Sequence, residues 1–244
     1  MRPGSFIIND VDSLDLDAVI VNWFDTTIPE RKITLNDSPI GIDRSIITDN
    51  KAYKNREFEI TIAFRGKWDN VSTQITKFIQ AIDGKGYVDA CFYFDQEFIY
   101  KIVRTGVTSV ERPSRISKYR EIKVNISAMP YKYMAGEHIY EISSGTSLVV
   151  QNPFNYEAKP SIQIVATGTT VLKINNQSVS FTGLTGNIYL DSDFQDAWSY
   201  DKNNKLVNEN SKMSRSSFPI LESGLNTISI SNGKAIINAK WRTL

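Results

Sequence analysis

The stretch VVQNPFNYEAKP, residues 149–160, divides the chain at Asn152-Pro153 into two halves of different character. Upstream, long alternating segments surround one amphipathic helical pattern. Downstream, short apolar segments alternate with Asn- and Gly-rich turns and show no helical period, which is typical of a β-sandwich. We therefore predict a mainly β chain with two domains.

Three regions follow from this division. Residues 1–130 are predicted to form a β-sandwich-like domain that carries the helix. Residues 131–151, which follow Met129-Pro130, are predicted to be a connector because a proline cannot donate to a central strand ladder. Residues 152–244 are predicted to form a C-terminal β-sandwich, whose last hairpin turns at Asn232-Gly233, a dipeptide that tolerates positive φ angles.

The helix is predicted at about residues 69–83. It follows a strand in which Phe58 to Phe64 alternate between apolar and polar side chains, and Asp69 or Asn70 can cap its first turn. Its apolar side chains recur at helical spacing until Asp83-Gly84. We assign this stripe to packing against the sheet. The stripe consists of Val71, Ile75, Phe78, Ile79 and Ile82.

The segment before this strand is less regular. Residues 19–24 and 32–35 predict two strands, and a turn follows at residues 36–39. Residues 40–54 are polar, and two interpretations stay open for them: a flexible surface loop, or an extended arm that bridges to a neighbouring subunit.

Composition excludes several classes of function. The 244 residues carry 28 Lys plus Arg and 27 Asp plus Glu, a net charge of +1, so no surface is dominated by the basic residues that bind a phosphate backbone. No apolar run approaches the length of a membrane span. The single Cys91 lies among aromatic residues and is predicted to be a buried strand residue in a protein made in a reducing cytoplasm.

No catalytic, cofactor or metal site is predicted. The sequence lacks the glycine patterns that cradle phosphates or dinucleotides. His138 is the only histidine, so a zinc site of the usual kind lacks ligands, and a Ser-His-Asp triad has no local support. We expect a protein that is not an enzyme.

Two segments could contact a ligand. Asp193, Trp198 and Tyr200 combine acidic and aromatic groups in one segment, which fits a glycan or Ca²⁺ site, although a solvated turn beside core aromatics explains the same spacing and is favoured. The basic stretch of Arg112, Arg115, Lys118 and Arg120 could touch an acidic partner or line a channel for DNA. A solvated loop is the more common meaning of such a run.

An ordered set of short motifs is similar to the distal tail proteins of long-tailed phages that infect Gram-positive bacteria. The resemblance extends over essentially the whole chain. The motifs are NISAMPYKYMAGE (residues 125–137), VVQNPFNYEAKPSIQIVATGT (149–169), LKINNQSVSF (172–181), IYLDSD (188–193) and GLNTISISNGKAIINAKWRTL (224–244).

The resemblance implies a virion component at the distal end of the tail. Six copies would form a ring through their N-terminal domains, stacked on the tail tube protein and joined to the tail-associated baseplate or spike protein. DNA would pass through the axial opening without specific binding. The C-terminal domains would be galectin-like in shape and could anchor receptor-binding proteins; a shared fold does not transfer sugar binding. The alternative function that the sequence leaves open is a carbohydrate-binding module for host cell-wall polysaccharide.

Overall fold

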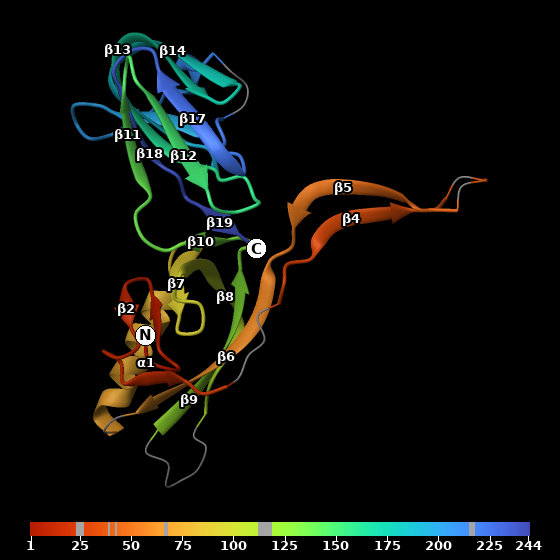
Figure 1. Ribbon diagram of the computed structural model, residues 1–244. Coiled ribbons are helices and arrows are strands. Elements are labelled where there is room, and N and C mark those ends of the chain that lie inside the picture. Colours follow the sequence, from red (N-terminus) through yellow and green to blue (C-terminus); the bar gives the residue numbers. More distant parts are fainter. Residues whose placement is uncertain (23–26, 39, 42, 66–67, 112–118, 215–217) are drawn as a thin grey trace. The chain divides into compact units, whose positions relative to one another are not determined.

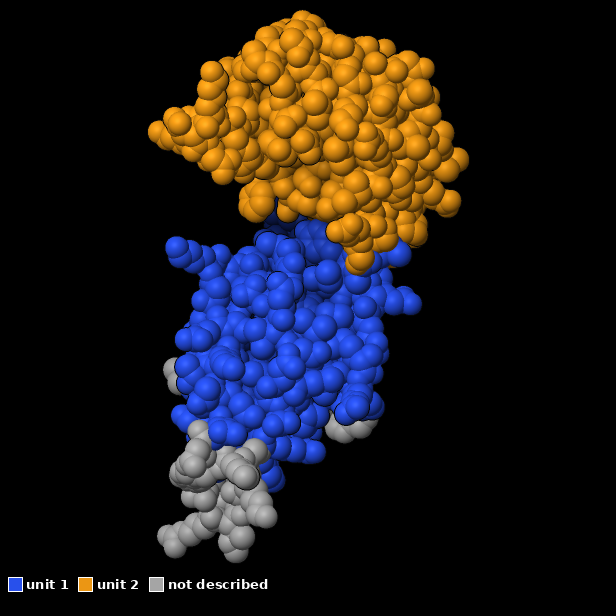
Figure 2. Space-filling view, turned by 90° about the vertical axis from the view of Figure 1, so that its left-hand side faces the viewer, with its two compact units in different colours: residues 1–135, 244 blue, residues 136–243 orange. Residues whose placement is uncertain are grey.

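The computed structural model describes residues 1–22, 27–38, 40–41, 43–65, 68–111, 119–214 and 218–244 (Figure 1). The chain is mainly β, as predicted, and its strands pair antiparallel. It divides into unit 1, residues 1–135 and 244, and unit 2, residues 136–243 (Figure 2). Trp23, Phe24 and the basic residues Arg112, Arg115 and Lys118 lie outside the described residues.

Unit 1 contains one curled sheet, a helix and a separate pair of strands. The sheet has the order β2-β1-β7-β8-β9-β6-β3, with β10 paired to β8, and β4 pairs with β5 alone in the described part of the unit. The elements are β1 (Phe6–Ile8), β2 (Val11–Asp12), β3 (Ala18–Ile20), β4 (Arg31–Asn36), β5 (Ile46–Tyr53), β6 (Arg56–Arg65), α1 (Trp68–Ile82), β7 (Val88–Phe92), β8 (Phe98–Glu111), β9 (Tyr119–Ala128) and β10 (Lys132–Met134).

Helix α1 lies within one residue of its predicted bounds, and its apolar stripe packs on the sheet. Asp69 and Asn70, predicted as caps, instead lie inside its first turn. Phe78 is fully buried and makes edge-on ring contacts with Phe6 of β1 at 5.9 Å and Phe64 of β6 at 5.7 Å. Because β1 and β6 are not neighbours in the sheet, both can reach one side chain only if the sheet curls around the helix.

Unit 2 is a two-layer β-sandwich built around one long hairpin, β13–β14. The first half of β13 pairs with β18, and its second half pairs with β17. One layer therefore has the order β11-β18-β13-β14-β15-β16, and the other contains β12 and β17. The elements are β11 (Ile139–Ser143), β12 (Ser147–Asn152), β13 (Ser161–Ile174), β14 (Gln177–Asp191), β15 (Asp196–Tyr200), β16 (Leu206–Asn208), the short 3₁₀ helix η1 (Asn210–Lys212), β17 (Gly224–Ile230), β18 (Lys234–Asn238) and β19 (Arg242–Thr243).

A β-bulge lets the long hairpin change layers. Gly168 pairs with Leu184, whereas Thr170 pairs with Phe181, so β14 carries one extra residue at this point. The extra residue shifts the parity of β14: Phe181 is buried before the bulge and Leu184 after it. Gly183, at φ 66°, supplies the left-handed backbone that the bend requires. Both halves of the strand thus keep their apolar side chains in the core.

The segment predicted as a connector, residues 131–151, differs in the structure. It contains β10, β11 and most of β12, and the boundary between units falls at Ala135/Gly136. Strand β12 pairs with β17 as far as Asn152 opposite Gly224. Pro153 ends this strand instead of separating two domains. The buried Asn152 side chain donates to the carbonyls of Tyr156 (2.8 Å) and Glu222 (3.2 Å), which fixes the turn.

Of the two interpretations of residues 40–54, the structure favours the extended arm, because most of the segment is a strand. Strand β5 runs through it and pairs with β4, so the two strands form a β-ribbon, called the arm below (Figure 1). The upstream strand β3 pairs with β6 in the main sheet. Whether the arm reaches a neighbouring subunit stays a prediction at this point.

Truncation of the central helix side chain should destabilise unit 1. Phe78→Ala leaves a cavity between the helix and two strands, and we expect it to lower the free energy of unfolding by about 3 to 5 kcal/mol. The matched control is Lys77→Ala, which removes an exposed side chain on the same turn. Urea denaturation followed by circular dichroism measures both. Equal stability of the two variants would contradict the packing of α1.

Candidate functional site

The arm presents an apolar face to solvent. Leu35 lies directly opposite Ile47, and Ile33 lies two residues along on the same face. These three side chains are 62%, 64% and 42% exposed. A two-stranded hairpin is marginally stable in water when nothing covers it. An exposed apolar row on such a hairpin is a candidate surface for contact with a partner.

The opposite face of the arm is mostly polar, although Ile46, which lies opposite Asn36, is 49% exposed on it. Thr34 lies opposite Thr48, and Asn36 donates from its side-chain amide to the Thr48 hydroxyl at 3.1 Å. Near the base, the Arg31 guanidinium binds the Asp49 carboxylate through two hydrogen bonds, and because Asp49 lies opposite Ile33, this ion pair borders the apolar row. Hydrogen bonding from Arg31 holds the pKa of Asp49 below its ordinary value. The face with Ile33, Leu35 and Ile47 is the more apolar of the two, and it is the candidate contact.

Arg56 fastens the base of the arm to the main sheet of unit 1. Its side chain is 5% exposed and donates to the carbonyl oxygens of Thr27 (3.3 Å) and Pro130 (2.9 Å). Its guanidinium lies 5.7 Å from the centre of the Tyr100 ring, an arrangement that favours a cation. These contacts join the chain before β4 to the chain after β9.

A charged cluster lies beside Arg56. The Tyr100 hydroxyl donates to Asp95 Oδ2 at 2.6 Å, and the Lys132 ammonium donates to the same oxygen at 2.7 Å. Burial, followed by this hydrogen bond to a carboxylate, raises the pKa of Tyr100 well above its ordinary range. Tyr100 therefore acts as a neutral hydrogen-bond donor, so the cluster is structural.

The candidate glycan contacts separate in the structure. Trp198 and Tyr200 of β15 both pack against Tyr189 of β14, with ring centres 6.0 Å and 5.6 Å apart. Asp193 instead lies in the β14–β15 turn, where it pairs with Lys159 at 3.0 Å and approaches Arg242 at 4.0 Å. The aromatic pair is thus brought together, and the carboxylate is used elsewhere.

Tyr189 was missed by sequence reasoning, although a signal for it exists. It lies between Ile188 and Leu190, which are buried, so strand alternation turns it to the outer face. A hollow of about 350 Å³ lies on this face. It is lined by Ile139, Ser161, Ile162, Gln163, Tyr189, Leu190, Asp191, Trp198, Ile236 and Asn238.

Trp198 carries a polar atom without a partner. Its indole Nε1 is buried and makes no hydrogen bond to any group in the described part of the chain. An unsatisfied buried donor costs about 1 to 3 kcal/mol, so its presence beside a hollow calls for an explanation.

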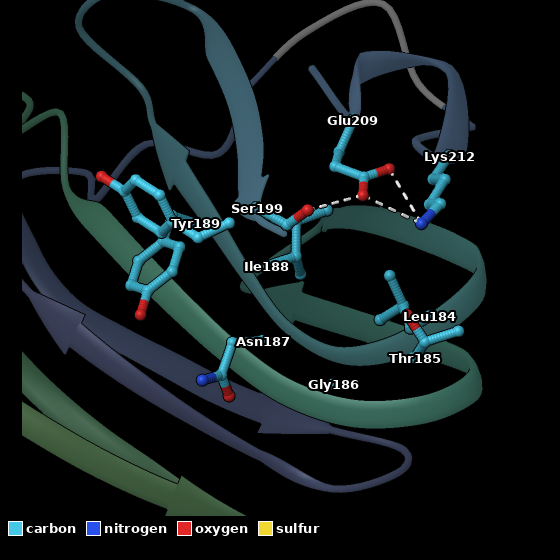
Figure 3. A pocket seen from close by; sticks show the side chains of 10 residues that line it. Leu184, Thr185, Gly186, Asn187, Ile188, Tyr189, Ser199, Glu209 and Lys212 are labelled. Atoms are coloured by element: carbon cyan, nitrogen blue, oxygen red, sulfur yellow. Dashed lines mark hydrogen bonds and ion pairs between the residues drawn. The ribbon is translucent and has the colours of Figure 1, made fainter. Parts of the chain in front are cut away.

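A second hollow of about 180 Å³ contains a paired carboxylate (Figure 3). Glu209 accepts a hydrogen bond from the Ser199 hydroxyl at 2.7 Å and lies 2.9 Å from the Lys212 ammonium. Burial alone would raise the pKa of Glu209, but the bonds from Lys212 and Ser199 outweigh it and lower the pKa. Since Ser199 donates to a stable carboxylate, this arrangement does not activate it as a nucleophile.

The remaining candidates show no convergent chemistry. Cys91 lies half-buried in β7, and burial raises the pKa of its thiol, which lowers its reactivity at neutral pH. The His138 carbonyl accepts a hydrogen bond from the Ala239 amide at 3.0 Å. Among the described residues, no three His, Cys, Asp or Glu side chains gather as metal ligands. No helix found there is long and apolar enough to cross a membrane.

Comparison with known proteins supports the predicted fold through one solved structure. No protein-family model and no curated protein matches the sequence. Among solved structures, the chain is similar to SPP1 Dit (gp 19.1), described as a paradigm of hub adsorption apparatus in Gram-positive infecting phages. The TM-score is 0.70 at 12% identity, covering 98% of this chain and 99% of that chain. The predicted resemblance is thus confirmed at the level of the fold, across both units.

Removal of the Arg56 side chain should loosen the base of the arm. Arg56→Ala removes the donor from two part-buried carbonyl groups, and we expect it to lower the free energy of unfolding by about 1 kcal/mol. Hydrogen exchange should also accelerate at the Lys54 amide, which bonds the Glu30 carbonyl at 2.8 Å. Arg65→Ala, on the exposed end of the same strand, is the control. Unchanged exchange in Arg56→Ala would contradict the fastening role.

The ionised carboxylate of Glu209 should stabilise the fold at neutral pH, and this contribution should be lost in acid. Its pKa is lowered on folding from an ordinary value of 4.5, so its contribution is complete above that pH and is lost as the pH falls through the lowered value. We expect Glu209→Gln to lower Tm at pH 7, and the difference from the parent protein to shrink as the pH falls below 4.5. Glu137→Gln, an exposed position of unit 2, is the control. A Tm difference that does not depend on pH would refute the assignment.

Proposed function

We propose that this chain is a structural phage distal tail protein that forms a ring and catalyses no reaction. The observation that carries the proposal is the similarity of fold to a phage hub protein over both units and nearly the full length of each chain. The sites described above are consistent with it, since the charged groups around Asp95 and Glu209 are paired within the chain. On this proposal the protein is not an enzyme and needs no cofactor.

The ring is proposed to close through unit 1, with six copies. A ring needs heterologous contacts, in which one surface of a copy meets a different surface of the next. The arm suits such a contact because Leu35 and Ile47 are exposed on a ribbon that is anchored at its base by Arg56. Covering this row on a neighbouring copy would remove apolar surface from water and support the ribbon.

The proposed partners follow from the position at the distal end of the tail. The ring would stack on the tail tube protein, join the baseplate or spike protein and leave an axial channel. The net charge of +1 favours passage of DNA without specific binding, because binding to a phosphate backbone requires clustered basic residues. Unit 2 would be galectin-like and could anchor receptor-binding proteins. The protein would be made in the host cytoplasm and incorporated into the virion.

Assembly should depend on the apolar face of the arm. A buried Leu or Ile side chain contributes about 1.5 to 3 kcal/mol, so Leu35→Ser with Ile47→Ser should weaken self-association by at least about a hundredfold. The control is Thr34→Ser with Thr48→Ser, a directly opposed pair on the polar face. Analytical ultracentrifugation and negative-stain microscopy measure assembly, with and without the tail tube protein.

The proposal fails if the parent chain stays monomeric at high concentration with its tail partners present. Rings that form equally well in both double variants would leave the ring in place but exclude the arm as its contact. The melting temperature of each variant shows whether the fold is retained.

A further inference from the structure

We infer that the outer face of the β11-β18-β13-β14-β15 layer of unit 2 binds a neutral saccharide chain. Trp198 and Tyr189 would form the stacking platform, and Gln163 would supply the hydrogen bonds. This inference goes beyond the proposed structural function and does not depend on ring formation.

The strand register places these side chains in one row across the sheet. Trp198 lies opposite Tyr189, Tyr189 opposite Gln163, and Gln163 opposite Ile236. Their neighbours along each strand, such as Ala197 and Leu190, are fully buried on the other face. The row therefore belongs to the outward face, and the hollow of about 350 Å³ lies along it.

The chemistry of the row matches that of a sugar ring. A pyranose presents an apolar C–H face, which packs on an aromatic ring, and a rim of hydroxyl groups, which pair with amides. The side-chain amide of Gln163 lines the hollow and makes no hydrogen bond within the residues that the structure describes, so it is available. The indole Nε1 of Trp198, at the same site, is buried without a partner among the described residues, so a hydroxyl oxygen would reach it only after the ring rotates.

Charge at the border of the hollow favours a neutral ligand. Asp191, which lines it, is paired with Lys240 at 2.7 Å, and Glu141, next to Ile236 in the row, is paired with Lys234 at 3.0 Å. Each carboxylate is thus paired with its own lysine. The described lining residues include no further Lys or Arg that could bind a phosphate or a uronate. A hollow of a few hundred Å³ also fits a small ligand better than the broad surface that a protein partner covers.

The full chain should be titrated with soluble neutral hexasaccharides, namely cellohexaose, maltohexaose and chitohexaose, and with a hexagalacturonate as the charged comparison. Isothermal calorimetry and saturation-transfer NMR measure binding. We expect at least one neutral hexasaccharide to bind and Trp198→Ala to weaken its affinity at least tenfold. Trp198→Phe, which keeps a ring but loses the N–H, should show an intermediate loss.

Phe194→Ala is the matched control, because Phe194 is an aromatic residue of the β14–β15 turn that is 82% exposed and does not line the hollow. Its affinity should equal that of the parent chain. Should Trp198→Ala lose its fold, as judged by Tm, Gln163→Ala tests the same site from a neighbouring strand.

Three results would overturn the inference: no neutral hexasaccharide binds in the millimolar range, binding survives Trp198→Ala and Gln163→Ala unchanged, or only the charged oligosaccharide binds. In the first case, a tail protein that binds through Trp198 would assign the face to a protein partner. Ring assembly of Trp198→Ala should be normal, so failure of the saccharide site is distinguishable from failure of the proposed function.

Discussion

The packing of Phe78 against Phe6 and Phe64 holds the sheet of unit 1 in its curled form. The first strand and a strand near the far edge of the sheet meet on one helical side chain, so the curl cannot relax without opening the core. Strand β6 carries both Phe64 and Arg56, and it therefore links the core to the base of the arm. What unit 1 can present to a partner depends on this aromatic contact.

The two units leave apolar side chains exposed in different ways. The arm of unit 1 displays a row of aliphatic side chains on a ribbon that nothing supports in the described part of the unit, which suits a protein surface of matching shape. The outer face of unit 2 combines aromatic rings with an unpaired amide around a hollow. The first arrangement favours a large apolar contact, and the second favours a small polar ligand. Assembly and recognition are thus proposed on separate units.

Local patterns predicted much of the fold. The alternation in β6 and the helical spacing around Phe78 depend on side chains that are close in sequence, and both gave the correct elements. The region of residues 131–151 was harder to predict, because β12 is defined by its pairing with β17, more than seventy residues away. The arm was left open for the same reason: pairing of Leu35 with Ile47 is a non-local choice that alternation alone does not fix.

The candidate site was predicted only in part. Trp198 and Tyr200 were identified from composition, but Asp193 was grouped with them by spacing alone, and spacing does not show that its carboxylate turns toward Lys159. Tyr189 was overlooked because its partner in the row lies on the next strand, after a turn. The bulge at Gly183, which bends β14, has no distinct sequence signal beyond the glycine itself.

The central claim is that this chain works by assembly, with the arm as the contact between copies. A cryo-EM reconstruction of the virion tail to which the proposal assigns this chain tests it most directly. The account predicts a closed ring of this chain at the distal end of the tube, with Leu35 and Ile47 covered by the neighbouring copy. A map in which the chain is absent from the tip, or in which the arm's apolar face stays open to solvent, would contradict it.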